Sequence, residues 1–88
     1  MITKYIIIER NHSVIVFEKS LLHSEVAKPF GTIKSAGFCN VSIKNNTLEI
    51  KCFGASSTLK IDSNPTVDEA LIRDFLFIKA PKEVLITI

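Results

Sequence analysis

The chain has 88 residues, of which 47% are hydrophobic and 23% charged, and its formal net charge is +2. This length predicts a single domain over residues 1–88, and this composition excludes a disordered chain. The small positive excess gives no argument for a nucleic-acid or membrane surface, and no segment approaches the roughly 18 apolar residues of a membrane span.

Two short apolar runs near the amino end, residues 5–9 and 14–17, predict a β-hairpin. A two-residue turn at residues 11–12 would pair Ile8 with Ile15. Ile7 and Val16 then lie on the opposite face, so both faces of the hairpin are apolar. Such strands are usually central in a sheet that is covered on both sides, or that a partner covers on one side.

The next segment, residues 20–28 (SLLHSEVAK), predicts a short helix. Ser20 is its expected N-cap, and Pro29 lies close to where the helix should end. A long β region follows over residues 32–62, and its clearest turn is at residues 45–46. Both turn residues are Asn, which tolerates the left-handed backbone that two-residue turns need.

Pairing about this turn sorts the hairpin into two rows. Cys39 faces Cys52 in a row of apolar pairs, and the alternate row is polar as far as Asn40 and Lys51. A slip of the register by one residue would mix the two rows, so the pattern supports this register.

Two motifs in this region mirror each other, SAGFC and CFGAS. The same pairing makes each residue face its own kind, with Phe38 and Phe53 on the outward row. It also places Gly37 opposite Gly54, which predicts a hollow on the core face that a helix can approach closely. In an alternative arrangement, a tight turn at residues 55–56 folds the chain back as a third strand and ends the hairpin near Phe53.

Residues 63–77 (SNPTVDEALIRDFLF) predict a helix that packs on the sheet. Thr66 and Glu69 have the spacing of a capping box, although Pro65 or Asn64 could shift the start by a residue or two, and Asp68 lies off the apolar stripe. The stripe consists of Val67, Leu71, Phe75 and Ile78. The alternation of apolar residues in the final segment 83–88 predicts a half-buried strand.

Together these elements predict an α+β fold, an antiparallel β-sheet with two helices packed mainly on one face. Several short motifs resemble a group of small uncharacterised proteins from bacteria, phages and other mobile elements. They are His-x3-Ala from His23, the SAGF motif at 35–38, Gly-x-Ser-x-Thr-Leu-x-Ile from Gly54, and Ser-x-Pro from Ser63. The group has no established activity, so the resemblance implies a fold unit and supplies no catalytic residues.

His23 is the titratable residue that is most suggestive of chemistry. With Ser35, Cys39 or Ser56 nearby in space, it could activate a nucleophile. The chain has no nucleophile elbow and no oxyanion loop, so a packed or surface histidine is favoured and no catalytic residue is assigned. No spacing of ligands or glycines predicts a metal or a cofactor.

The thin core, the two-faced hairpin and the apolar final segment favour a small non-enzymatic interaction module. We expect it to self-associate as a dimer, with another protein as an alternative partner. The second hypothesis is a single-stranded nucleic-acid binder in which Phe38 and Phe53 stack bases beside Lys44 and Lys51. A small hydrolase centred on His23 is the least favoured hypothesis.

The candidate binding residues are therefore Phe38, Phe53, Lys51, Lys44, His23, Gly37, Gly54 and Ser56. The amino end lacks the features of a secretory signal, so we expect a cytoplasmic protein with reduced cysteines and no membrane segment.

Overall fold

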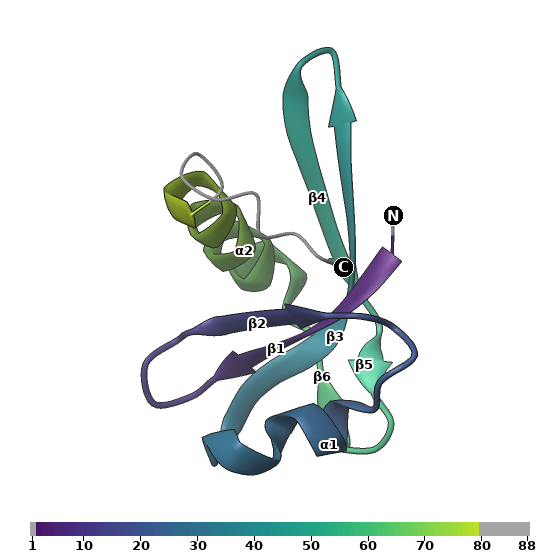
Figure 1. The fold of residues 1–88 in the computed structure, drawn as a ribbon, viewed down its shortest axis with the longest axis vertical. Coiled ribbons are helices and arrows are strands. Elements are labelled where there is room, and N and C mark those ends of the chain that lie inside the picture. The colour runs from purple at the N-terminus through teal and green to yellow at the C-terminus, as the bar shows by residue number, and fades with distance from the viewer. Residues whose placement is uncertain (1, 80–88) are drawn as a thin grey trace.

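A computed structural model describes residues 2–79 of the chain. Its elements, shown in Figure 1, are β1 (Ile2–Ile8), β2 (Val14–Phe17), α1 (His23–Ala27), η1 (Lys28–Phe30), β3 (Ile33–Lys44), β4 (Thr47–Phe53), β5 (Ala55–Ser56), β6 (Ile61–Asp62) and α2 (Pro65–Lys79). Four antiparallel strands form one sheet in the order β2-β1-β3-β4, and β5 pairs with β6 in a second sheet. The predicted antiparallel α+β class is confirmed. The strand predicted over 83–88 lies outside the described residues.

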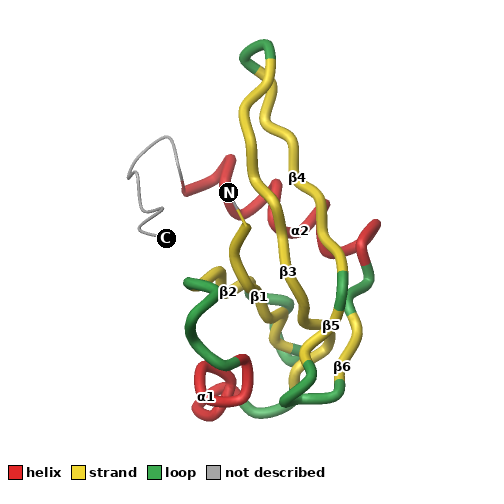
Figure 2. Tube along the Cα trace, turned by 90° about the vertical axis from the view of Figure 1, so that its right-hand side faces the viewer, coloured by secondary structure: helices red, strands yellow, loops and turns green. Residues whose placement is uncertain are grey.

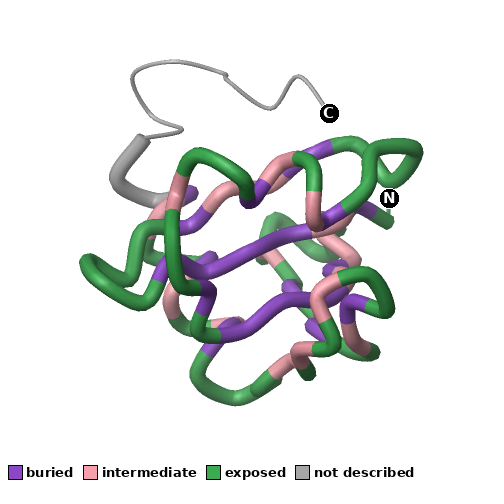
Figure 3. Tube along the Cα trace, turned by 90° about the horizontal axis from the view of Figure 1, so that it is seen from below, coloured by how far each residue is buried: buried purple, intermediate pink, exposed green. Residues whose placement is uncertain are grey.

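The central strand β1 is buried on both faces, as its apolar pattern predicts. Tyr5 and Ile7 contribute to one core, and Ile6 and Ile8 contribute to another on the opposite face. Figure 3 shows buried strands running through the middle of the molecule, with exposed turns around them. The sheet therefore has two covered faces rather than one.

The two helices lie on these opposite faces. Ile72 and Leu76 of α2 pack in the core of Tyr5 and Ile7, and we call this side of the sheet the α2 face. Ala27 of α1 packs in the core of Ile6 and Ile8, which is the α1 face. The prediction that both helices lie mainly on one face is wrong, because a central strand that is apolar on both sides requires a cover on each.

The first hairpin has a longer turn than predicted. Ile6 rather than Ile8 pairs with Ile15, because the Ile8 N–H donates to the Ser13 carbonyl at 2.9 Å and the His12 N–H donates to the Ile8 carbonyl at 2.8 Å, which closes the turn over residues 9–12. A shift of two residues leaves every side chain on its original face. The predicted faces are therefore correct although the predicted pairs are not.

Helix α1 is shorter than the predicted span 20–28. It begins at His23, and Leu22 before it makes no side-chain capping bond. Ser20 is not the N-cap, because its hydroxyl donates to Glu18 Oε1 at 2.8 Å.

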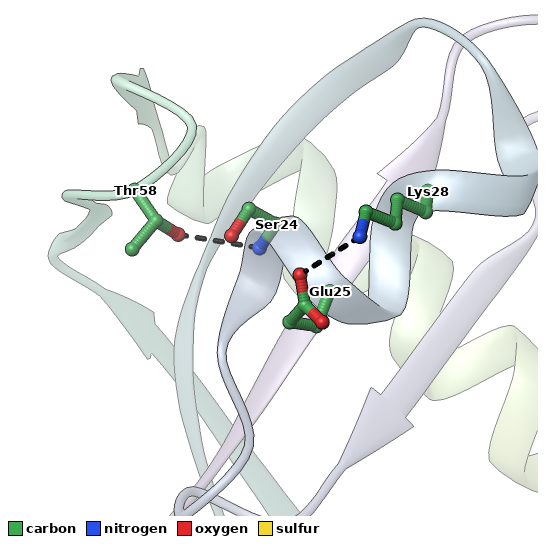
Figure 4. A network of polar contacts seen from close by, with 4 residues as sticks. All are labelled: Ser24, Glu25, Lys28 and Thr58. Atoms are coloured by element: carbon green, nitrogen blue, oxygen red, sulfur yellow. Dashed lines mark hydrogen bonds and ion pairs between the residues drawn. The ribbon is translucent and has the colours of Figure 1, made fainter.

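A contact from a distant turn contributes to holding α1 in place. The backbone N–H of Ser24 donates to Thr58 Oγ1 at 3.2 Å, and Figure 4 shows this bond joining α1 to the turn between β5 and β6. The 3.3 Å ion pair between Glu25 and Lys28 in the same figure is exposed and adds little stability.

The register predicted for the second hairpin is confirmed from the turn to Phe38. The ladder pairs Lys44 with Thr47 and continues without a shift to Phe38 and Phe53. Both turn residues, at 45 and 46, have positive φ angles of 53° and 61°. The outer end of this hairpin projects beyond the rest of the molecule, away from α1, as Figure 2 shows.

The mirror pairing does not extend past Phe53. Gly54 has a φ of 74°, and there the chain turns away from β3. Ser56 pairs with Ile61 of β6 instead of with Ser35. The alternative tight turn at residues 55–56 is also wrong, since the reversal follows Ser56, but the predicted end of the hairpin near Phe53 is correct.

Helix α2 begins at Pro65 and presents a different face to the sheet than predicted. Asp68 rather than Glu69 accepts from the chain before the helix, through the Asn64 N–H at 2.7 Å, so the predicted capping box is wrong. Asp68 is 1% exposed and Val67 is 39% exposed. The side of α2 that faces the sheet therefore includes Asp68 and not Val67, which the predicted stripe contained. The side chain of Ile78 lies outside the described residues.

Candidate functional site

Four rings form a continuous row on the α1 face, which we call the aromatic row. Phe17 meets His23 edge to face at 5.4 Å between centroids, and His23 meets Phe38 in the same way at 5.9 Å. Phe38 and Phe53 are stacked at 5.7 Å with planes 18° apart. Phe17 is 8% exposed and Phe53 is 41% exposed, so the row runs from the core to the surface.

His23 is a packed residue of this row. It is 3% exposed, and its Nε2 donates to the Gly37 carbonyl at 2.9 Å, which places the proton on Nε2. Burial lowers its pKa, although the bond to Gly37 acts in the opposite direction. A buried histidine that packs edge to face against two phenylalanine rings and donates to a backbone carbonyl has a structural role.

The hydroxyl and thiol groups that the sequence suggested as partners of His23 bond elsewhere. Ser35 Oγ donates to Asp68 Oδ1 at 2.7 Å, and Cys39 Sγ lies 3.1 Å from Thr3 Oγ1 on the α2 face. Neither Ser35 nor Cys39 is therefore placed as the nucleophile that the hydrolase hypothesis needs beside His23.

The predicted hollow between Gly37 and Gly54 does not exist. A Cβ added at Gly37 would lie 2.7 Å from the Phe53 carbonyl oxygen and 3.1 Å from Ser63 Cβ. A Cβ at Gly54 would lie 3.2 Å from the Phe38 ring. The corner between β4 and β5 fills this space, so both glycines serve close packing rather than a binding cavity.

Ser56 is also structural. It is 1% exposed, and its hydroxyl accepts from the Leu59 N–H at 3.1 Å within the turn after β5.

The lysines near the aromatic row differ in their distance from its exposed end. Lys51 lies on the same face as Phe53, two residues earlier in β4, and is exposed. Lys44 is exposed but lies next to the turn of the hairpin. Lys4 was not among the residues expected here, but its Nζ lies 5.9 Å from the Phe38 centroid and donates to the Leu21 carbonyl at 2.7 Å. The pairing of β1 with β3 would have shown it.

A buried carboxylate fixes α2 to the sheet. Asp68 accepts hydrogen bonds from the Tyr5 hydroxyl, from Ser35 Oγ and from the Asn64 backbone. Burial, and next the bond to Asp68, raise the pKa of Tyr5, which keeps the phenol protonated as the donor. Among the described residues no buried polar side-chain atom lacks a hydrogen-bond partner, so this network is structural and complete.

The two cysteines are buried free thiols. Burial raises the pKa of Cys39, and burial together with the neighbouring Cys39 raises the pKa of Cys52 to about 12. Such thiols stay protonated and act as small apolar residues of the α2 core.

The second candidate surface is the outer edge of β4. In the sheet formed by residues 2–79, β4 has a neighbour only on the β3 side. At one point this edge is occupied, because the Cys52 N–H donates to Glu69 Oε2 of α2 at 2.8 Å.

The projecting end of the β3–β4 hairpin, residues 41–50, is here called the arm. On its α2 face Ile50 is 3% exposed at the base, Val41 and Leu48 are half-buried, and Ile43 is 76% exposed. Apolar side chains therefore continue along the arm beyond the point where α2 covers them.

Comparisons of the chain with protein-family models, with curated proteins and with solved structures find no match. The resemblance to mobile-element proteins therefore stays a prediction. No helix within residues 2–79 is long and apolar enough to cross a membrane, and that part of the chain holds no cluster of three potential metal ligands.

Proposed function

We propose that this protein is a small interaction module that self-associates through the arm and the outer edge of β4. The observation that carries the proposal is the apolar row of the arm, which ends in an Ile43 that is 76% exposed. Most of this isoleucine faces water in the monomer, whereas a second molecule that covers it removes apolar surface from water.

The open edge of β4 supports the same function. Exposed edge strands offer unpaired backbone groups to another strand, and natural proteins usually blunt or cover them. Here the exposed apolar row and the open edge belong to the same hairpin, so one partner can cover both.

Sedimentation equilibrium over a range of protein concentrations tests the proposal. We expect a reversible monomer–dimer equilibrium, which Ile43→Lys weakens about tenfold or more because the lysine would have to be buried in the contact. Ser42→Lys adds the same charge to the opposite face of the arm and is the matched control. A wild-type protein that stays monomeric at high micromolar concentration contradicts the proposal.

A second candidate function is the binding of single-stranded nucleic acid. It is favoured by one observation, the 41% exposed Phe53 at the open end of the aromatic row, with Lys51 on the same face of β4. A base could extend the stack of Phe38 and Phe53 while Lys51 contacts the backbone phosphates.

Titration with a fluorescent single-stranded oligonucleotide at low salt tests this second candidate. Phe53→Ser should abolish binding, and Lys51→Ala should reduce its dependence on salt. Val67→Ser removes a similarly exposed apolar side chain from α2 and should leave binding unchanged. Wild-type protein that binds no oligonucleotide excludes this function.

A further inference from the structure

The sequence of β4 is complementary to itself when read in the opposite direction. Around Ile50, the flanking residues are Glu49 and Lys51, which carry opposite charges, and beyond them Leu48 and Cys52, which are both apolar. If two copies of β4 lie antiparallel with Ile50 opposite Ile50, then Glu49 of each copy faces Lys51 of the other. Opposite charges facing each other across strands favour such a register.

The hydrogen bonds of the hairpin agree with this centre. The Cys52 N–H points away from β3, since it donates to Glu69 of α2. Backbone groups of an antiparallel strand alternate between its two edges, so Ile50 and Leu48 also present N–H and C=O groups to the outer edge. Ile50 can therefore exchange two hydrogen bonds with Ile50 of a second copy across a twofold axis.

Neighbouring registers lack this agreement. Centring the pair on Glu49 or Lys51 places like charges opposite each other and turns the central N–H toward β3. Centring it on Cys52 requires an N–H that Glu69 already occupies. Of Glu49, Ile50, Lys51 and Cys52, Ile50 is thus the centre at which charge and hydrogen bonding agree.

From this complementarity we infer that two copies of the chain join β4 to β4 about Ile50 and merge their sheets into one. The inference rests on the proposed self-association and names its partner, a second copy of the chain, and its register. Because Glu69 holds the Cys52 N–H, the new ladder relies on the groups of Leu48 and Ile50 and on the Cys52 carbonyl.

The register also gives the exposed Ile43 a neighbour. Ile43 pairs with Leu48 within the hairpin, and Leu48 lies beside Cys52 of the second copy. The α2 helix contacts β4 at Cys52, so the second copy's α2, whose first turn carries the exposed Val67, lies next to this end of the arm.

A charge exchange tests the register directly. Glu49→Lys alone gives a copy with two lysines at the paired positions, and Lys51→Glu alone gives a copy with two glutamates. Each single variant should dimerise about tenfold or more weakly than wild type, because both pairs become repulsive. An equimolar mixture should form heterodimers, and the double variant Glu49→Lys/Lys51→Glu should regain the wild-type dimer constant.

Sedimentation measures the dimer constants, and native mass spectrometry with one copy labelled with nitrogen-15 counts the heterodimers. Lys19→Glu, which changes an exposed charge in the turn after β2 and outside the β3–β4 hairpin, should leave dimerisation unchanged. The double variant has the composition of the wild type, so circular dichroism on it separates a folding defect from a lost contact.

The outcomes distinguish the two proposals. A wild-type dimer whose single charge variants do not recover on mixing overturns the Ile50 register and leaves self-association standing. A wild-type chain that is monomeric throughout removes both proposals.

Discussion

The base and the arm of the β3–β4 hairpin share one continuous ladder but have different surroundings. At the base, Cys39 and Cys52 are 0% and 6% exposed in the core that α2 covers. Toward the tip of the arm, Ile43 is 76% exposed. The asparagine turn and the backbone ladder continue into the arm where the core cover ends. Packing therefore holds the base, whereas the asparagine turn and the backbone hydrogen bonds hold the arm, which leaves the arm's surface open to a partner.

The largest effect on stability is expected from the loss of Asp68, the buried carboxylate between α2 and the sheet. Asp68→Ala removes the shared acceptor of Tyr5 and Ser35, and we expect the free energy of unfolding to fall by about 3 kcal/mol or more. Asp74→Ala changes an exposed residue of the same helix and should cost less than about 0.5 kcal/mol. Urea denaturation followed by circular dichroism measures both, and equal effects of the two variants would show that the network does not hold α2.

The glycine at the base should be the next most sensitive position. Gly37→Ala places a Cβ against the Phe53 carbonyl, and we expect a loss of about 1–3 kcal/mol in the free energy of unfolding. Gly31→Ala meets open space and is opposed only by its φ of 77°, so it should cost about 1 kcal/mol. If Gly31→Ala were the more harmful of the two, the corner between β4 and β5 would not be as tight as described.

The buried His23 makes the free energy of unfolding of the protein depend on pH. Burial lowers its pKa in the folded state, so the unfolded chain takes up a proton that the folded chain does not. The stabilisation is complete above the unfolded pKa of about 6.5 and is lost as the pH falls, by up to about 1.4 kcal/mol per pH unit. Denaturation between pH 7.5 and 5.5 should show this slope in wild type and a reduced slope in His23→Gln. His12→Asn, in the exposed turn, removes the other histidine and should keep the slope.

The smallest effect on stability is expected in the arm. Ile43→Lys, measured at concentrations where the monomer prevails, should change the free energy of unfolding by less than about 0.5 kcal/mol, because the side chain is already exposed. The same substitution should have a large effect on self-association. A strong loss of monomer stability would mean that the arm, like the base, depends on packing.

The parts of the fold that depend on neighbouring residues could be predicted from the sequence. The turn at residues 45–46 and the two rows of the second hairpin specify its register, and every predicted pair from Lys44 to Phe38 is present. The alternation of apolar residues on both sides of β1 likewise predicts a strand with two covered faces. These signals are local, so a single sequence contains them.

The parts that depend on distant residues could not be predicted. Asp68 looks like an exposed helix residue until Tyr5, 63 positions away, donates to it and turns that side of α2 inward. The sequence left two arrangements open for the end of the ladder, and the positive φ of Gly54 decides for an end at Phe53. The candidate residues show the same division. Phe38, Phe53 and Lys51 lie where the predicted register places them, because that register is local. The predicted hollow between the glycines is filled by the corner between β4 and β5 and by Ser63, which lies outside the ladder.

The bond between Glu69 and Cys52 also bears on solubility. A flat strand edge that is open along its whole length invites the addition of further chains and the growth of fibres. Here the Glu69 carboxylate accepts the Cys52 N–H, so an incoming strand can form fewer backbone hydrogen bonds than the length of β4 would allow. Glu69→Ala would return that donor to the edge, and turbidity of concentrated samples would report the added tendency to aggregate. We therefore expect this single side chain of α2 to limit polymerisation.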